Sequence, residues 1–240
     1  MLKIDAAGLS HRQINEAIRA ARGDITLSGC QGQRFIAAGM GSRSVTIEGI
    51  PGNALGAYLN GGELTVNGNA QDAVGDTMNA GRIVIHGSIG DTAGYAMRGG
   101  EIYVRDNAGY RIGIHMKAYR DKLPVIVIGG CAGSFLGEYQ AGGLLLVLGL
   151  NQDGKSIVKN FPCTGMHGGK LVVRSDCRDI LFPKQVCVRQ ANADDLIEIQ
   201  PYLRAFSQHF GADYDFLLNH PYTVVTPDSR NPYKEMYVIN

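Results

Sequence analysis

Two glycine-rich turns hold the side chains whose types could do chemistry. Cys131 lies in the turn 129–133, and His167 lies in the turn 165–169. A cysteine nucleophile needs a neighbouring base and a cationic setting, and the sequence places no histidine beside Cys131. His167 likewise has no second acid–base group next to it. We interpret Cys131, like Cys30 in a similar turn, as a small corner residue, and we expect His167 to bond a turn carbonyl or to face a partner. Both residues remain candidates for an interface or a substrate path.

The remaining candidate groups are incomplete as sites. The segment 39–42, Gly-Met-Gly-Ser, resembles a phosphate-binding loop only loosely, because it lacks the Lys-Ser/Thr pair and the strand–glycine–helix context. Asp72, Asp76 and Asp91 give neither the calcium β-roll pattern nor paired carboxylates. The six histidines form no i, i+4 pair and no Cys/His cluster. We expect no catalytic residue, no metal site and no cofactor bound by this chain.

A repeat of about 19 residues must position these turns, and it decides the fold. Each repeat opens with a short segment whose second and fourth residues are apolar, so that they share one face of a strand. The segments open at Asp24, Ser44, Glu63, Arg82, Glu101, Pro124, Leu144 and Lys170. The predicted inward pairs are Ile25/Leu27, Val45/Ile47, Leu64/Val66, Ile83/Ile85, Ile102/Val104, Val125/Val127, Leu145/Val147 and Leu171/Val173. A repeat that cannot bury its apolar face alone must stack on its neighbours.

Glycine and methionine recur at fixed places between these strands. A Gly-x-x-x-Gly element and a closing small pair allow positive φ at corners and close approach of neighbouring coils. These glycines are Gly52, Gly56, Gly75, Gly90, Gly94, Gly109, Gly113, Gly133, Gly137, Gly168 and Gly169. In the first repeat, Ile36 stands where we expect a corner glycine. An apolar ladder inside the stack is predicted from Met40, Leu59, Met78, Met97, Met116 and Met166, which precede most strands by four residues.

These patterns predict an all-β fold, a single-stranded right-handed parallel β-helix of about seven coils with short capping helices at its N- and C-terminal ends. Residues 1–23 form the N-terminal cap, with a capping box at 10–13. The β-helix occupies 24–190. Residues 191–240 form a C-terminal helix, either kinked at Pro201 or beginning near it, and an extended tail from Asn219.

Two repeats are apolar on both predicted faces. Their outward positions are Ile126, Ile128, Leu144, Leu146 and Leu148. A strand that is apolar on both faces is covered on both faces, because large exposed apolar patches are rare on monomers. We expect the chain's own C-terminal helix to provide the cover. Another subunit is the alternative, and a homo-oligomer stays open.

Composition narrows the class of protein. The 240 residues carry a formal net charge of +1, with 33 glycines and no tryptophan. No basic run indicates a nucleic-acid partner, and no apolar segment reaches the length that spans a bilayer. The first residues lack the pattern of a signal peptide, and five cysteines without a C-x-x-C pair are typical of reduced thiols. We expect a cytoplasmic protein that binds neither nucleic acid nor membrane.

The glycine repeat with its closing Gly-Gly resembles the GXGXG domain, which forms the C-terminal part of the glutamate synthase large subunit. The opening coil, 27–35, is similar to the first repeat of that domain. The run 164–169 and the end of the chain, 224–233, resemble the stand-alone archaeal-type version of the domain. The resemblance extends over about residues 9–237.

The resemblance implies a non-catalytic scaffold subunit of a glutamate-synthase-like oxidoreductase complex, active in glutamate biosynthesis and ammonia assimilation. It implies a glutaminase (amidotransferase) subunit and an FMN-dependent synthase subunit as partners, which would carry the FMN and the iron–sulfur cluster. Two relatives share the repeat and stay as alternatives: the β-helical subunit of formylmethanofuran dehydrogenase and the third subunit of N-methylglutamate-synthase-like enzymes. An independent β-helix acyltransferase is disfavoured, because such coils advance in hexapeptide steps.

Overall fold

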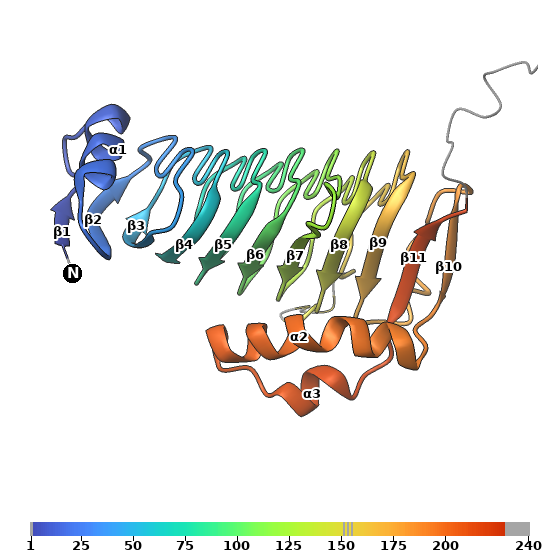
Figure 1. The fold of residues 1–240 in the computed structure, drawn as a ribbon. Coiled ribbons are helices and arrows are strands. Elements are labelled where there is room, and N and C mark those ends of the chain that lie inside the picture. The colour runs from blue at the N-terminus through green and yellow to red at the C-terminus, as the bar shows by residue number, and fades with distance from the viewer. Residues whose placement is uncertain (1, 151, 153, 155, 229–240) are drawn as a thin grey trace, which may run out of the picture.

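The computed structural model describes residues 2–150, 152, 154 and 156–228 (Figure 1). One eleven-stranded sheet has the order β1-β2-β3-β4-β5-β6-β7-β8-β9-β11-β10. Its strands are β1 (Leu2–Asp5), β2 (Ile25–Gln31), β3 (Ser44–Ile50), β4 (Asn60–Asn67), β5 (Ala80–Ile85), β6 (Gly100–Val104), β7 (Pro124–Ile128), β8 (Ala141–Val147), β9 (Gly168–Val173), β10 (Val186–Gln190) and β11 (Thr223–Pro227). The helices are α1 (His11–Ala20), α2 (Ala193–Phe210) and α3 (Tyr214–Leu218).

Strands β1 to β9 run parallel, and each pairs with the next one along the chain. This is the order that a solenoid produces, because each coil returns to lie directly on the preceding one. The strands β2 to β9 mark about eight coils, one more than predicted. The predicted all-β parallel β-helix is confirmed.

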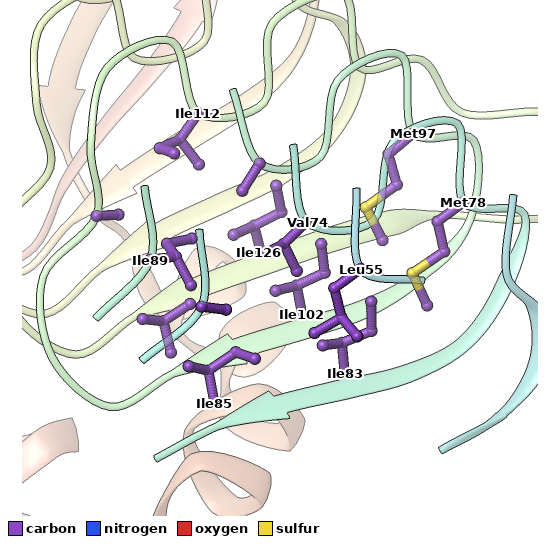
Figure 2. Close-up of a cluster of buried hydrophobic side chains, with 14 of the residues drawn as sticks. Leu55, Val74, Met78, Ile83, Ile85, Ile89, Met97, Ile102, Ile112 and Ile126 are labelled. Carbon is purple, nitrogen blue, oxygen red and sulfur yellow. The ribbon is translucent and has the colours of Figure 1, made fainter. Parts of the chain in front are cut away.

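The core lies inside the coils, where apolar side chains of successive strands stack in register. One such column joins Leu64, Ile83, Ile102, Ile126 and Leu145, all of them fully buried. Figure 2 shows part of this interior, with the side chains of several coils facing one another. The predicted apolar ladder is confirmed, because Met40, Leu59, Met78, Met97, Met116 and Met166 are all buried.

Strand β7 corrects one of the predicted inward pairs. Ile126 pairs with the inward residue Ile102, and Ile126 and Ile128 belong to the interior cluster. Val125 and Val127, which were predicted to point inward, lie in the second cluster on the outer face. A shift of one residue exchanges the two faces of a strand. The alternation could not choose between the faces here, because both are apolar.

The corner glycines relieve crowding inside the coil, as Gly94 illustrates. Its φ is +69°, and a Cβ there would lie 2.3 Å from Cδ1 of Ile126. A side chain would be strained twice, by the backbone and by the core. The first coil departs from the expectation at Ile36, because Ile36 is a fully buried core residue and the equivalent corner is Ala37, with φ of +58°.

Helix α1 covers the N-terminal end of the stack (Figure 1). The predicted capping box is confirmed: the Ser10 hydroxyl accepts from the Gln13 N–H, and the Gln13 side chain accepts from the Ser10 N–H. Ile14 and Ile18 are buried against the first coils. The helix therefore covers apolar side chains that an open end would expose to solvent.

Helix α2 lies along the outer face of the later strands (Figure 1). Ile199, Leu203 and Phe206 are fully buried in one cluster with Val127 of β7 and Leu146 of β8. The expectation that the chain's own helix covers the two-sided apolar strands is confirmed. The helix is continuous through Pro201 and ends at Gly211, which has a left-handed conformation. Among the described residues, none of the helices combines the length with the apolar composition that a membrane span requires.

The segment after Asn219 corrects the expectation of an extended tail. Strand β11 inserts between β9 and β10 and pairs antiparallel with both. Val224 and Val225 are fully buried, so this segment continues the sheet. The last part of the predicted tail, 229–240, lies outside the described residues.

Candidate functional site

His167 lies at the corner that precedes β9, and it is half-buried. Its ring nitrogen Nδ1 is 3.0 Å from the carbonyl oxygen of Gly165, and its backbone N–H donates to the carbonyl oxygen of Gln140. The predicted bond to a turn carbonyl is therefore present. Contact with a partner or a substrate path stays a prediction.

Cys131 lines a surface pocket of about 520 Å³, together with Tyr110, Ser134 and Lys159. Its backbone N–H donates to Oδ1 of Asn107, 2.8 Å away in the preceding coil. Among the described residues that line the pocket there is no histidine and no carboxylate that could serve as a base. His167 is not part of this lining, so the pocket does not combine the two candidates.

Two further cysteines, Cys30 and Cys163, are buried. Burial raises the pKa of the Cys30 thiol to about 11, and the carboxylate of Asp5 adds to the effect. Burial also raises the pKa of Cys163, which sits in the core at a corner with φ of +59°. A thiol with a raised pKa stays protonated at neutral pH and is a poor nucleophile. Both cysteines act as small apolar core residues.

The corner carboxylates connect neighbouring coils. Oδ1 of Asp72 accepts from the backbone N–H of Asp91 at 2.9 Å, and Oδ1 of Asp91 accepts from the N–H of Tyr110 at 2.8 Å. A Cβ on Gly90 would lie 2.1 Å from Oδ1 of Asp72. Glycine therefore leaves the room that the carboxylate occupies, and the acid satisfies an N–H of the next coil. Asp76 instead accepts from the hydroxyl of Thr77 at 2.7 Å.

The segment 39–42 is a corner of the first coil. The N–H of Gly39 donates to the carbonyl oxygen of Ala57 at 2.8 Å, and Met40 is buried in the core. The segment borders a hollow of about 310 Å³ near Arg43. The Arg43 guanidinium donates to the carbonyl oxygen of Ile18, so this cation fastens α1 to the stack.

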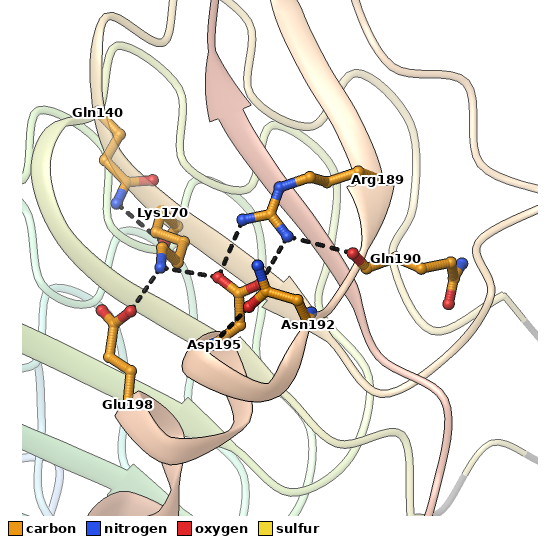
Figure 3. Close-up of polar contacts among 7 residues, drawn as sticks. All are labelled: Gln140, Lys170, Arg189, Gln190, Asn192, Asp195 and Glu198. Carbon is orange, nitrogen blue, oxygen red and sulfur yellow. Dashed lines mark hydrogen bonds and ion pairs between the residues drawn. The ribbon is translucent and has the colours of Figure 1, made fainter.

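A charged network anchors the start of α2, and sequence reasoning did not find it (Figure 3). Asp195 is almost fully buried and accepts from Arg189 at 2.5 and 3.0 Å and from Lys170 at 3.2 Å. Asp195 also forms a capping box with Asn192. The Arg189 guanidinium, first among these contacts, holds the pKa of Asp195 well below its usual range. The network joins α2 to β9 and β10, and its charged groups bond to one another.

Gln140 was also missed, although its spacing gave a signal. It lies four residues before Leu144, the place that methionine takes in other repeats, and it is fully buried. Its Nε2 donates to the carbonyl oxygens of Gly142 and Gly143 at 3.2 and 3.1 Å. These carbonyls lie where the pairing of β8 with β9 shifts register. Gln140 therefore serves an irregular stretch of backbone, while its Oε1 has no hydrogen-bond partner among the described residues.

The candidate residues thus bond mainly to the backbone of their own or adjacent coils. No group of three or more His, Cys, Asp or Glu that could hold a metal ion occurs within the described part of the chain. Oxygen ligands such as Asp72 and Asp91 already accept backbone hydrogen bonds. The arrangement favours a structural role for these corners.

Comparison with known proteins agrees with this architecture. A model of the family described as GXGXG motif matches residues 9–224. The chain is also similar to the uncharacterized protein MJ1350 of Methanocaldococcus jannaschii, with 42% identity over 248 residues, covering 98% of this chain and 95% of the relative. The glycine corners that hold the coils together are thus those of a known family: this chain belongs to the GXGXG family, that of the C-terminal domain of the glutamate synthase large subunit.

Proposed function

We propose that this chain is a non-catalytic scaffold subunit of a glutamate-synthase-like complex in glutamate biosynthesis. It docks a glutaminase subunit and an FMN-dependent synthase subunit, and the FMN and the iron–sulfur cluster are bound by those partners. The reaction takes place on the partners, and this chain sets their relative position.

One observation carries the proposal: polar side chains of the corners are hydrogen-bonded to the backbone of their own turn or of the next coil. Asp72, Asp91 and Asn107 accept backbone N–H groups of the next coil, and His167 bonds a carbonyl of its own turn. Family membership over residues 9–224 adds support, since the β-helix is a domain of glutamate synthase. A rigid stack of this kind is well suited to hold two other subunits apart at a constant distance.

Purification of the tagged protein from its native cells tests the proposal. We expect a glutaminase-type subunit and a flavoprotein to co-purify in fixed ratio, with the flavin absorption in the flavoprotein fraction. Glutamine-dependent glutamate formation is expected from the complex and not from the isolated chain. A protein that purifies alone, or an isolated chain with acyltransferase activity, contradicts the proposal.

The same purification separates the two related assemblies. A pterin subunit with molybdenum or tungsten in place of the flavoprotein assigns the chain to a formylmethanofuran-dehydrogenase-like complex. Formation of N-methylglutamate by the purified complex assigns the chain to an N-methylglutamate-synthase-like enzyme. Either result overturns the glutamate synthase assignment while keeping the scaffold role.

A further inference from the structure

The turns of the later coils carry a group of rings and cations, which we call the aromatic ridge: Tyr95, Arg111, His115, Phe135, Tyr139 and Phe161. Tyr95, Tyr139 and Phe161 are 41%, 39% and 60% exposed. Arg111 and His115 are exposed as well. Exposed aromatic side chains in one cluster are a typical mark of a protein interface.

The members of the ridge contact one another from coil to coil. The rings of His115 and Tyr139 are stacked at 5.2 Å with an interplanar angle of 8°, and Tyr95 lies edge-on to His115 at 5.9 Å. In a second row, Phe135 stacks on Phe161 at 5.3 Å, and the Arg111 guanidinium lies 4.8 Å from the Phe135 ring centroid. These contacts restrict the rings before any partner arrives, which lowers the entropy cost of binding.

The β-helix itself does not require rings at these places. Arg111, His115, Phe135, Tyr139 and Phe161 all have φ between +51° and +61°, a conformation that is costly for bulky residues. The equivalent turns of other coils have the same conformation with Ala54, Ala73 and Ala96. Since alanine suffices for the fold, the exposed rings require another explanation.

The charge around the ridge indicates the kind of partner. Arg98 and Lys117 follow the turns on one side, and both are exposed. On the other side Lys159 is exposed, while Asp91 accepts an N–H of the next coil. Glu138 is paired with Arg111 at 3.0 Å. Cations therefore exceed acids here, although the net charge of the whole chain is only +1. An acidic surface is complementary to this excess.

Two other occupants fit less well. Single-stranded nucleic acid stacks its bases on free ring faces, but four rings of the ridge are already stacked in pairs with each other. A second copy of the chain could place its own acids, Asp72 and Asp76, against these cations. The turns that hold these two acids are polar, and they have alanine or threonine at the positions where the ridge has rings. Those turns hold no exposed large apolar side chain that could cover the rings.

We propose that the aromatic ridge is the docking surface for a protein partner that presents aliphatic side chains surrounded by acids. The inference rests on the proposed function, and the partner is one of the two other subunits of that complex. Tyr139 lies in the middle of the contact, because its ring touches His115 on one side and covers Gly165 on the other. Central aromatic residues usually carry most of the binding energy of an interface.

The test compares Tyr139→Ala with Tyr58→Ala in binding to the co-purified glutaminase and flavoprotein subunits. Tyr58 is a matched control, because it is 58% exposed and has φ of +57° against +51° for Tyr139. We expect Tyr139→Ala to raise the dissociation constant of one subunit by about ten-fold or more, and Tyr58→Ala to change it less than two-fold. We expect the double charge reversal Arg98→Glu with Lys117→Glu to weaken the binding of the same subunit. The affinity of the wild-type chain for that subunit should fall as salt is added.

Three outcomes overturn the docking surface while leaving the scaffold role intact: unchanged binding by Tyr139→Ala, an equal loss in Tyr58→Ala, or a wild-type dimer that Tyr139→Ala dissociates in sedimentation. Binding of a labelled oligouridine that depends on Tyr139 overturns it in favour of nucleic acid. If no subunit co-purifies with the wild-type protein, both proposals fail. Thermal unfolding of each variant verifies that it is folded. We expect Tyr139→Ala to fold, because the equivalent turn of another coil has alanine, Ala96, in the same conformation.

Discussion

The earlier and later coils of the β-helix share their inward face and differ on their outward face. In β3 and β4 the outward residues Thr46 and Thr65 are half-buried. Next to them Arg82 forms ion pairs with Glu63 at 3.6 Å and with Glu101 at 2.9 Å. In β7 and β8 the outward residues are apolar and are buried under α2. The same repeat therefore supports a solvated surface in one region and an internal interface in the other.

This difference between the earlier and later coils shows that the two faces of one strand are under different structural requirements. The inward residues must be apolar in every coil, since each coil rests on its neighbours. The outward residues follow whatever lies over them, which is solvent for the earlier strands and the chain's own helix for the later ones. The turns differ as well: Tyr58 is an exposed ring in an earlier coil, whereas the rings of the aromatic ridge contact one another from coil to coil in the later ones. Four predictions test this comparison.

Phe206→Ala should have the largest effect. Phe206 is fully buried under the later strands, and we expect a loss of about 3–5 kcal/mol in the free energy of unfolding of that region. Hydrogen exchange should show new opening in α2, β7 and β8 and little change in β3 and β4. Ile197→Ala, on the exposed side of the same helix, is the control and should cost less than about 0.5 kcal/mol. Equal opening of both regions contradicts the comparison.

Gly94→Ala tests the inward face that both regions share. Its Cβ would lie 2.3 Å from Ile126 and its φ is positive, so we expect a cost of about 2–4 kcal/mol. Gly39→Ala is the matched control, with φ of +65° and no atom within 4 Å of the added Cβ, and should cost about 1 kcal/mol. Urea unfolding followed by circular dichroism measures both. Equal costs would mean that backbone conformation alone, without core crowding, selects glycine.

Asp195→Asn tests the anchor of α2 through its pH dependence. The pKa of Asp195 is lower in the folded chain, so its contribution is present above the unfolded pKa near 4 and is lost as the pH falls through the folded value. We expect a loss of about 1–3 kcal/mol at pH 7, because Arg189 and Lys170 are partly exposed. The difference from wild type should shrink below about pH 4. Asp194→Asn, on the exposed first turn, should cost a few tenths of a kcal/mol.

A difference between wild type and Asp195→Asn that is equally large at pH 7 and pH 3 would contradict this account. It would mean that the carboxylate charge does not hold α2 against the later coils.

Gln140→Met should have the smallest effect of the four. The substitution restores the apolar ladder but removes the donor to the carbonyl oxygens of Gly142 and Gly143. We expect a loss of about 1 kcal/mol, since the unpartnered Oε1 is removed at the same time. Thermal unfolding gives the measurement. A variant as stable as wild type would show that the register shift between β8 and β9 needs no side-chain donor.

Much of the fold could be predicted from the repeat. Alternating apolar residues, regularly spaced methionines and paired glycines each repeat with the coil, and their coincidence leaves few alternatives to a solenoid. The two-sided apolar strands predicted a cover by the C-terminal helix, and Ile199, Leu203 and Phe206 provide it. The corner residues were interpreted as structural from their incomplete chemistry. The bond from His167 to the Gly165 carbonyl agrees with that interpretation.

Other features depended on contacts between distant segments. The prediction assigned the two faces of β7 the wrong way round, because an apolar side chain fits either the core or the surface beneath α2. Strand β11 was not predicted, since its partner β9 lies 50 residues or more earlier in the chain. Asp195 gave no signal, because Lys170, Arg189 and the start of α2 meet only after the strands are stacked.

Except at β7, where both faces are apolar, the sequence by itself determined which residues point inward, because every coil must satisfy the same packing and the requirement is repeated in the residues. Only the tertiary structure decided the outward contacts: which strands α2 covers, where β11 joins the sheet, and which turns place their rings together. Each of those contacts occurs once, so no periodic pattern in the sequence predicts it. Shape and charge in the folded chain select the residues that meet.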